Sequence, residues 1–193
     1  MRSVSLVSCI VVLTAAAACG DSPAAPGPVD TALASLRTAT SPYQRVADAV
    51  AAGYQAPVAS ACVESPAGAM GVHSVNPALS QAPVQLERPP ILLYLPDAGA
   101  QDGFRLVGVE YSQAVLLRNA ATGAVAPWFA PTPWPDSHVV INPAPQLFGQ
   151  TFEAAHAGHG PGQPWHYDLH VWAWTENPSG TFAPFNPRLR CQN

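Results

Sequence analysis

Histidines and carboxylates inside apolar segments are the side chains of this 193-residue sequence best suited to chemistry. Asp168 and His170 stand two residues apart in one such segment, Glu110 lies in a second, and His73 lies in a third. Two imidazoles with one or two carboxylates form a ligand set that suits zinc, iron or manganese. These four residues predict a site for a metal ion or a small polar ligand.

The alternation of side chains along a strand decides which of these groups can meet. In the segment 166–174, alternate residues on one face are His166, Asp168, His170, Trp172 and Trp174. A face that passes from His and Asp to two tryptophans is typical of a cavity wall. We therefore expect Trp172 and Trp174 to wall the ligand pocket.

The segment 104–112 places its carboxylate by the same rule. Alternation puts Val107, Val109 and Tyr111 on one face, and Leu106, Gly108 and Glu110 on the other. Glu110 thus lies in a run that is apolar on both faces, which is costly for a charge without a partner.

Plainer interpretations of these residues stay open. A buried histidine is often only hydrogen-bonded, and Glu110 can pair with an arginine. His166 and His170 would lie about 13 Å apart on a straight strand at about 3.3 Å per residue, too far to share a metal. His156 and His159 lie in a Gly-rich loop, where adventitious metal affinity is the expectation, and His138 follows a turn and is expected to be exposed.

Composition excludes several classes of function. The sequence has 8 basic residues, all arginine, against 12 acidic ones, for a net charge of −4. Without lysine there is no Schiff-base chemistry, and without clustered positive charge there is no nucleic-acid partner. The sequence also lacks a Gly-x-Ser-x-Gly nucleophile turn and a Gly-rich phosphate loop.

The N-terminus has the pattern of an export signal. Arg2 precedes an apolar run that is too short to span a bilayer, and small residues follow it. The segment Ala16 to Gly20 resembles the bacterial lipoprotein signal, although Ala16 stands where leucine is usual. The resemblance implies a signal peptide over 1–18 and a lipid on Cys19, with the membrane as partner. A composition rich in Gly, Pro, Ala and Ser, without apolar periodicity, predicts a disordered tether over 19–29. Cleavage after Ala18 without lipidation is the alternative, and Gly20 favours an outer-membrane address.

Cysteine parity bears on the same question. Four cysteines occur, at positions 9, 19, 62 and 191. If Cys19 carries a lipid, Cys62 and Cys191 remain as an even pair in an oxidising compartment and predict a disulfide. Two buried free thiols are the alternative.

One domain over 30–193 is expected to position the candidate site. Apolar spacing predicts a short helical piece over 31–37 and a stronger helix from Ser41 to about Tyr54, with Gly53 as its stop. Strands are predicted at 71–75, 91–95, 104–112, 115–118 and 166–174, with a hairpin loop at 96–103 and a long proline-rich loop at 124–145. The predicted fold class is α+β, mainly antiparallel β in a curved sheet or small barrel, with an N-terminal helix packed on it.

Four blocks of the chain resemble a family of uncharacterised secreted bacterial proteins. They are GAMGVHSVNP (68–77), RLVGVEY (105–111), QLFGQTF (146–152) and YDLHVWAWTENPSGTFAPFNPRLRC (167–191). Within this resemblance, glutamate is usual where Asp168 stands and tryptophan where Phe185 stands. The resemblance supports the domain boundaries and implies no reaction.

The leading hypothesis is a lipid-anchored envelope protein whose domain binds a metal or small polar ligand at His73, Glu110, Asp168 and His170. A non-enzymatic structural or interaction module is the second hypothesis. A metal-dependent hydrolase or oxygenase is the third, so the sequence leaves enzyme activity open. It also leaves the small-molecule or protein partner open.

Overall fold

The computed structural model describes residues 26–129, 138–158 and 163–191. The predicted signal peptide, the lipidation at Cys19 and His159 lie outside these ranges. None of the helices within them is long and apolar enough to cross a membrane.

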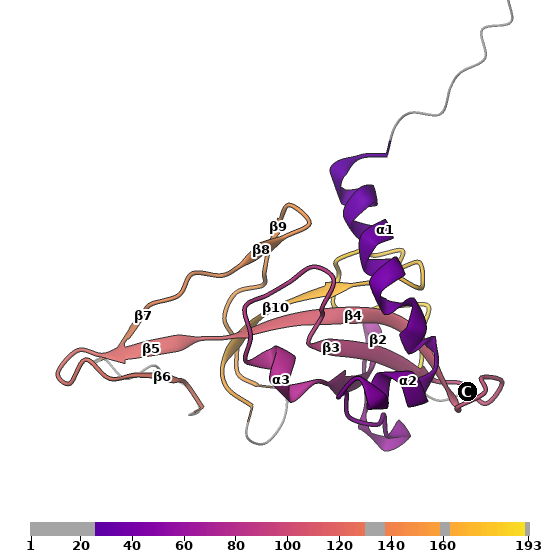
Figure 1. Cartoon of the computed structure of the whole chain (residues 1–193), viewed down its shortest axis with the longest axis horizontal. Helices are drawn as coiled ribbons and strands as arrows, with labels where there is room; N and C mark the ends of the chain where they lie inside the picture. Colours follow the sequence, from indigo (N-terminus) through magenta and orange to yellow (C-terminus); the bar gives the residue numbers. More distant parts are fainter. Residues whose placement is uncertain (1–25, 130–137, 159–162, 192–193) are drawn as a thin grey trace, which may run out of the picture.

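The fold is α+β, with a curled antiparallel five-stranded half-barrel and an N-terminal helix, which confirms the predicted class (Figure 1). The helical elements are α1 (Pro28–Thr40), η1 (Ser41–Gln44), α2 (Val46–Ala51), η2 (Ala59–Ala61) and α3 (Pro77–Ser80). The strands are β1 (Cys62–Ser65), β2 (Gly68–Val75), β3 (Ile91–Pro96), β4 (Phe104–Ala114), β5 (Leu116–Asn119), β6 (Val125–Pro127), β7 (His138–Val140), β8 (Gln146–Leu147), β9 (Gln150–Thr151) and β10 (His166–Val171).

The main sheet has the strand order β1-β2-β3-β4-β10, and all neighbours pair antiparallel. One face, which we call the helix face, carries Val72, Leu92, Val109 and Leu169 and packs with Leu36 of α1 in the larger hydrophobic core. Alternation turns His73, Glu110, Asp168 and His170 to the opposite face, which we call the site face.

The helices differ from the prediction in their lengths. The first helix is the longer one: Pro28 stands at its first turn, Asp30 lies near its positive end, and Leu33 and Leu36 are buried. The predicted helix from Ser41 to Tyr54 is broken, because Arg45 has extended backbone between η1 and α2. Gly53 ends α2 with a φ of 95°, as its position predicted.

A β-bulge changes the predicted faces of β4. The β3–β4 register shifts between Leu93 and Tyr94. On the far side of this shift, Leu106 joins the larger core and Val107 joins a second core with Leu93 and Trp172. The prediction for Leu106 and Val107 was therefore wrong, whereas Glu110, beyond the bulge, keeps its predicted face.

The proline-rich segment contains strands that the sequence did not predict. β6 and β7 flank β5 in a separate three-stranded sheet, which extends away from the main sheet (Figure 1). Both are edge strands, where a proline such as Pro127 is tolerated because its missing N–H faces away from the pairing partner. Residues 130–137 of this segment lie outside the described ranges.

The predicted disulfide is present between Cys62 and Cys191, with a Cα–Cα distance of 5.6 Å across a sequence separation of 129. Cys191 packs against the second core, on the same side of the sheet as the site face, and Cys62 packs against both cores. The bond ties the start of β1 to the end of the described chain.

Candidate metal centre

Three of the predicted site residues meet on the site face from three strands. Glu110 of β4 stands directly opposite His170 of β10 in the register. Their side chains approach to 3.6 Å between Glu110 Oε2 and His170 Nε2. His73 of β2 reaches the same oxygen with its Nε2 at 2.9 Å. His73 and Glu110 are separated by β3, so the curl of the sheet brings them together.

The innermost members of this group are almost wholly buried. Glu110 is 1% exposed and His170 is 0% exposed. Neither ring nitrogen of His170 makes a hydrogen bond within the described part of the chain. A buried polar group left unpaired costs about 1–3 kcal/mol. A cation bound between these side chains would satisfy both the imidazole and the carboxylate.

The charges of this group stabilise one another. Burial alone would raise the pKa of Glu110, but His73 and His170 outweigh it and lower this pKa to about 2. Burial likewise tends to lower the pKa of His73, while the charge and hydrogen bond of Glu110 raise it above its usual value. Glu110 is therefore a carboxylate at neutral pH, which is the form that ligates a metal.

Asp168 lies in an adjoining group with two histidines that the prediction left out. Its Oδ2 lies 3.2 Å from His156 Nε2 and 3.8 Å from His166 Nε2. The hydrogen bond to Asp168 is the largest cause of a raised pKa of His156, which reaches about 9. The ligand atoms of His156, His166 and Asp168 all lie within 4.8 Å of one another.

Glu153 connects the two groups. Glu153, Asp168 and His170 also have ligand atoms within 4.8 Å of one another. The Glu153 N–H donates to the Asp168 carbonyl at 2.8 Å, which aligns this segment along the outer edge of β10. Burial, followed by the charge of Asp168, raises the pKa of the Glu153 carboxyl.

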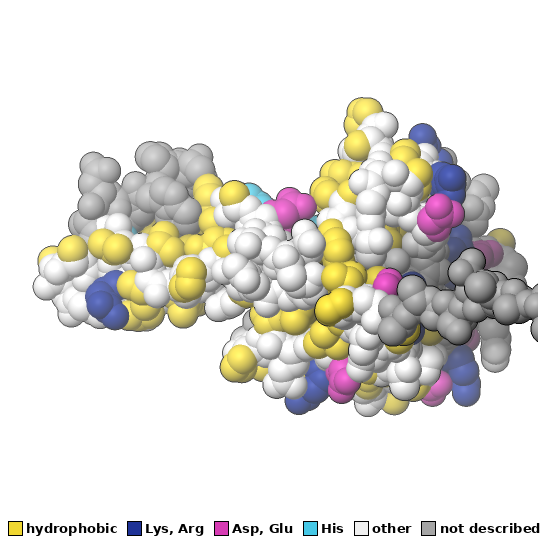
Figure 2. Space-filling view, turned by 90° about the horizontal axis from the view of Figure 1, so that it is seen from above, with side chains coloured by type: hydrophobic (Ala, Val, Ile, Leu, Met, Phe, Trp, Pro, Cys, Tyr) yellow, Lys and Arg dark blue, Asp and Glu magenta, His cyan; other side chains and the backbone are white. Residues whose placement is uncertain are grey.

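A cavity of about 1040 Å³ opens over the site face, and His73, Glu110 and His166 line it. Apolar side chains, including Val63, Ile91 and Phe129, form much of the remaining wall. Figure 2 shows a histidine and an acidic side chain at the surface between the main body and the extended three-stranded sheet. Because His73 and Glu110 line the cavity, a small molecule can approach the first group from it.

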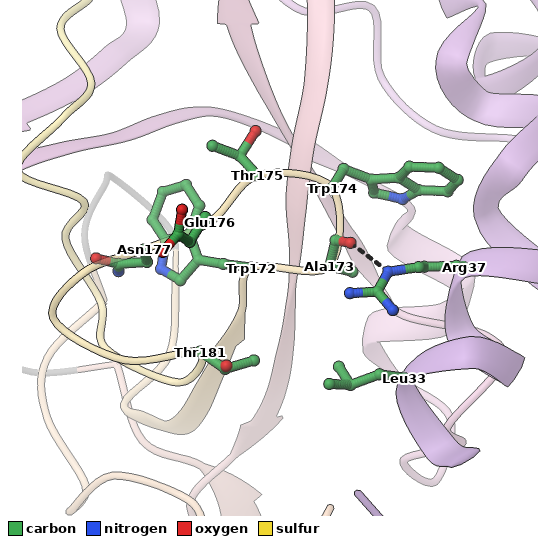
Figure 3. Close-up of a pocket in the computed structure, with 9 residues that line it drawn as sticks. All are labelled: Leu33, Arg37, Trp172, Ala173, Trp174, Thr175, Glu176, Asn177 and Thr181. Atoms are coloured by element: carbon green, nitrogen blue, oxygen red, sulfur yellow. Dashed lines mark hydrogen bonds between the residues drawn. The ribbon is translucent and has the colours of Figure 1, made fainter. Parts of the chain in front are cut away.

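The structure places the two predicted pocket tryptophans elsewhere. β10 ends at Val171, and Trp172 is buried in the second core, with its Nε1–H donating to Ala183 O at 2.6 Å. Trp174 donates to Thr40 Oγ1 of α1 at 3.1 Å. Both line a separate pocket of about 350 Å³ beside Arg37, whose Nε–H donates to the Ala173 carbonyl (Figure 3). Neither lines the cavity over His73 and Glu110.

The prediction thus found one three-residue group and a single member of the next. Strand alternation places His166 on the same face as Asp168 and His170, but the expected distance between His166 and His170 argues against a shared metal. Glu153 and His156 belong to a segment whose pairing with β10 is non-local, so the sequence did not indicate Glu153 and predicted only adventitious metal affinity for His156. His138, expected to be exposed, is partly buried, and its Nε2 lies 3.4 Å from Asn119 Nδ2.

No protein-family model, no curated protein and no solved structure matches this chain. The donor set itself is two imidazoles and one carboxylate in each of the first two groups. Such sets bind zinc, iron or manganese and leave further coordination positions for water or a ligand.

Proposed function

We propose that this protein is a lipid-anchored envelope protein whose domain binds a divalent metal ion through His73, Glu110 and His170. The observation that carries the proposal is the buried His170 imidazole, which has no hydrogen bond in the described ranges and lies beside the Glu110 carboxylate. Zinc, iron and manganese are the candidate ions, since each accepts nitrogen and carboxylate ligands together.

The anchor is the second part of this proposal. A lipid on Cys19 and the tether that follows it would hold the domain at the envelope membrane, with an outer-membrane address. Supporting it is the disulfide between Cys62 and Cys191, because disulfides persist in oxidising compartments outside the cytoplasm. Changing Cys19 to Ser should release the protein from the membrane fraction and abolish labelling by a fatty-acid analogue. Wild-type protein that takes up no label would contradict the anchor and leave the metal proposal standing.

Metal content of the purified, tag-free full chain tests the ion site. We expect near-stoichiometric zinc, iron or manganese, and a loss of at least one equivalent in the double variant His73→Ala, His170→Ala. His138→Ala is the matched control, because this histidine lies outside the three groups and contacts Asn119. Absence of metal after refolding with each of the three ions would favour the structural or interaction module instead.

A metal-dependent hydrolase or oxygenase is the second candidate function, and the cavity beside His73 and Glu110 favours it. A metal with open coordination positions can polarise a carbonyl or phosphoryl oxygen or activate a bound water. Glu110 and the two histidines would hold the ion, and the cavity wall would bind and orient the substrate. Activity that requires the ion and disappears in Glu110→Gln at unchanged folding would support this candidate over a purely binding role.

A further inference from the structure

The second group repeats the composition of the first. His156, His166 and Asp168 again offer two imidazoles and one carboxylate, and in this group, as in that of His73, Glu110 and His170, the ligand atoms all lie within 4.8 Å of one another. Asp168 is 1% exposed and His166 is 5% exposed. A buried donor set of this kind is costly to fold and is expected where it serves a bound cation.

Backbone carbonyls orient both imidazoles of this group. His166 Nδ1 lies 3.0 Å from Pro164 O, and His156 Nδ1 lies 3.1 Å from Ala157 O. A carbonyl partner holds a proton on Nδ1, so Nε2 is the nitrogen that would ligate a cation after releasing its own proton. In both histidines Nε2 is the atom that faces Asp168. Metal-binding histidines are commonly held in this way.

Ion pairing alone does not account for the arrangement. His156 and His166 both approach the same Asp168 oxygen, and the 3.8 Å distance from His166 is too long for a hydrogen bond. The other oxygen, Oδ1, is buried and makes no hydrogen bond with any described residue. Glu153 and His170 stand beside Asp168 on its other side.

From this geometry we infer a second divalent-cation site at His156, His166 and Asp168, adjacent to the first, so that the protein carries a metal pair. Glu153, Asp168 and His170 form a third group with ligand atoms within 4.8 Å of one another, and this group takes one residue from each of the two sites, which makes the sites adjacent. This inference rests on the proposed function, since it adds an ion to the same centre.

Zinc titration of the metal-free full chain, followed by calorimetry and elemental analysis, separates the two proposals. We expect two equivalents in the wild type and one in each single variant, His73→Ala and His156→Ala. His156 is the milder position to change in the second group, because its side chain is 31% exposed. His138→Ala should keep both equivalents. One equivalent in the wild type that is retained in His156→Ala would overturn the second site alone, whereas no bound zinc at all would overturn the proposed function.

Manganese loading gives a readout that needs no variant. Two adjacent Mn²⁺ ions couple magnetically, so the electron paramagnetic resonance signal per ion should fall as the second equivalent binds. A second equivalent that adds a full, uncoupled signal would contradict an adjacent pair. The same titration in His156→Ala should show the uncoupled signal of a single bound ion.

Discussion

The two faces of the main sheet differ in the hydrogen bonding of their buried polar groups. On the helix face, three buried phenols donate to backbone carbonyls: Tyr54 to Pro89, Tyr94 to Tyr43, and Tyr111 to Leu86. On the site face, Asp168 and His170 each have a buried side-chain atom without a hydrogen bond inside the described ranges. The three phenols of the helix face are hydrogen-bonded within the fold, whereas the site face has donor atoms available for a ligand.

Breaking the disulfide should have the largest effect, and it should act on the site face. In the chain-entropy estimate, a bond that closes a loop of this length stabilises the fold by about 5 kcal/mol. Because Cys191 packs against the second core on the site-face side and the bond fixes it to Cys62, reduction should lower both the melting temperature and the metal affinity. Thermal unfolding and zinc titration with and without reductant measure the two effects. Unchanged affinity well below the melting transition would mean that the bond serves stability alone.

Leu36→Ala should lower the stability of the fold through the helix face and leave metal binding unchanged. The side chain is 0% exposed and lies in the larger core. Truncating a buried leucine costs about 2–5 kcal/mol through lost apolar contact and a residual cavity. Urea unfolding measures the loss, and metal content per folded molecule should stay at the wild-type value. A parallel loss of metal would show that the two faces are not independent.

Metal removal should destabilise the protein through the site face and leave the packing of the helix face unchanged. An ion that binds only the folded chain stabilises it by about 2.7 kcal/mol at a free concentration 100 times its Kd. Dialysis against a chelator should therefore lower the melting temperature of the wild type and of Leu36→Ala by a similar amount. In the double variant His73→Ala, His170→Ala the chelator should have a smaller effect. An equal shift in that variant would place the stabilising ion outside the first group.

Tyr111→Phe should have the smallest effect, about 1 kcal/mol for one hydrogen bond. It should also change the alkaline limb of the stability curve. Burial raises the pKa of the Tyr111 phenol in the folded state. The neutral phenol thus favours folding, and its contribution is full below pH 10 and is lost as pH rises beyond that value. Urea unfolding at pH 8 and pH 11 should show a smaller alkaline loss in Tyr111→Phe than in the wild type.

Local patterns were sufficient for much of the sheet and for part of the centre. Alternation along β4 and β10 placed Glu110, Asp168 and His170 correctly on one face, because both segments are regular strands there. It failed at Val107, where one extra residue in the bulge reverses the faces. It failed again beyond Val171, where the strand ends and Trp174 turns towards α1.

The remaining ligand candidates depend on contacts between distant parts of the chain. His156 pairs with His166 through two backbone hydrogen bonds of 3.1 Å. Nothing in a loop rich in alanine and glycine predicts that partner. The same holds for the first helix, Pro28–Thr40, of which the apolar spacing predicted only 31–37. Leu33 and Leu36 pack into the larger core, and this tertiary contact stabilises the longer helix.

The direct pairing of Glu110 with His170 has a consequence for how the strands find their alignment. A slip of β10 by one residue would turn Asp168 and His170 into the apolar core beneath α1 and would bring Leu169 to the other face. The misaligned sheet would bury unpaired charges on one side and lose its donor atoms on the other. With the proposed cation bound, the correct alignment gains a further advantage over its nearest competitor, so the ion would also act as a check on strand pairing.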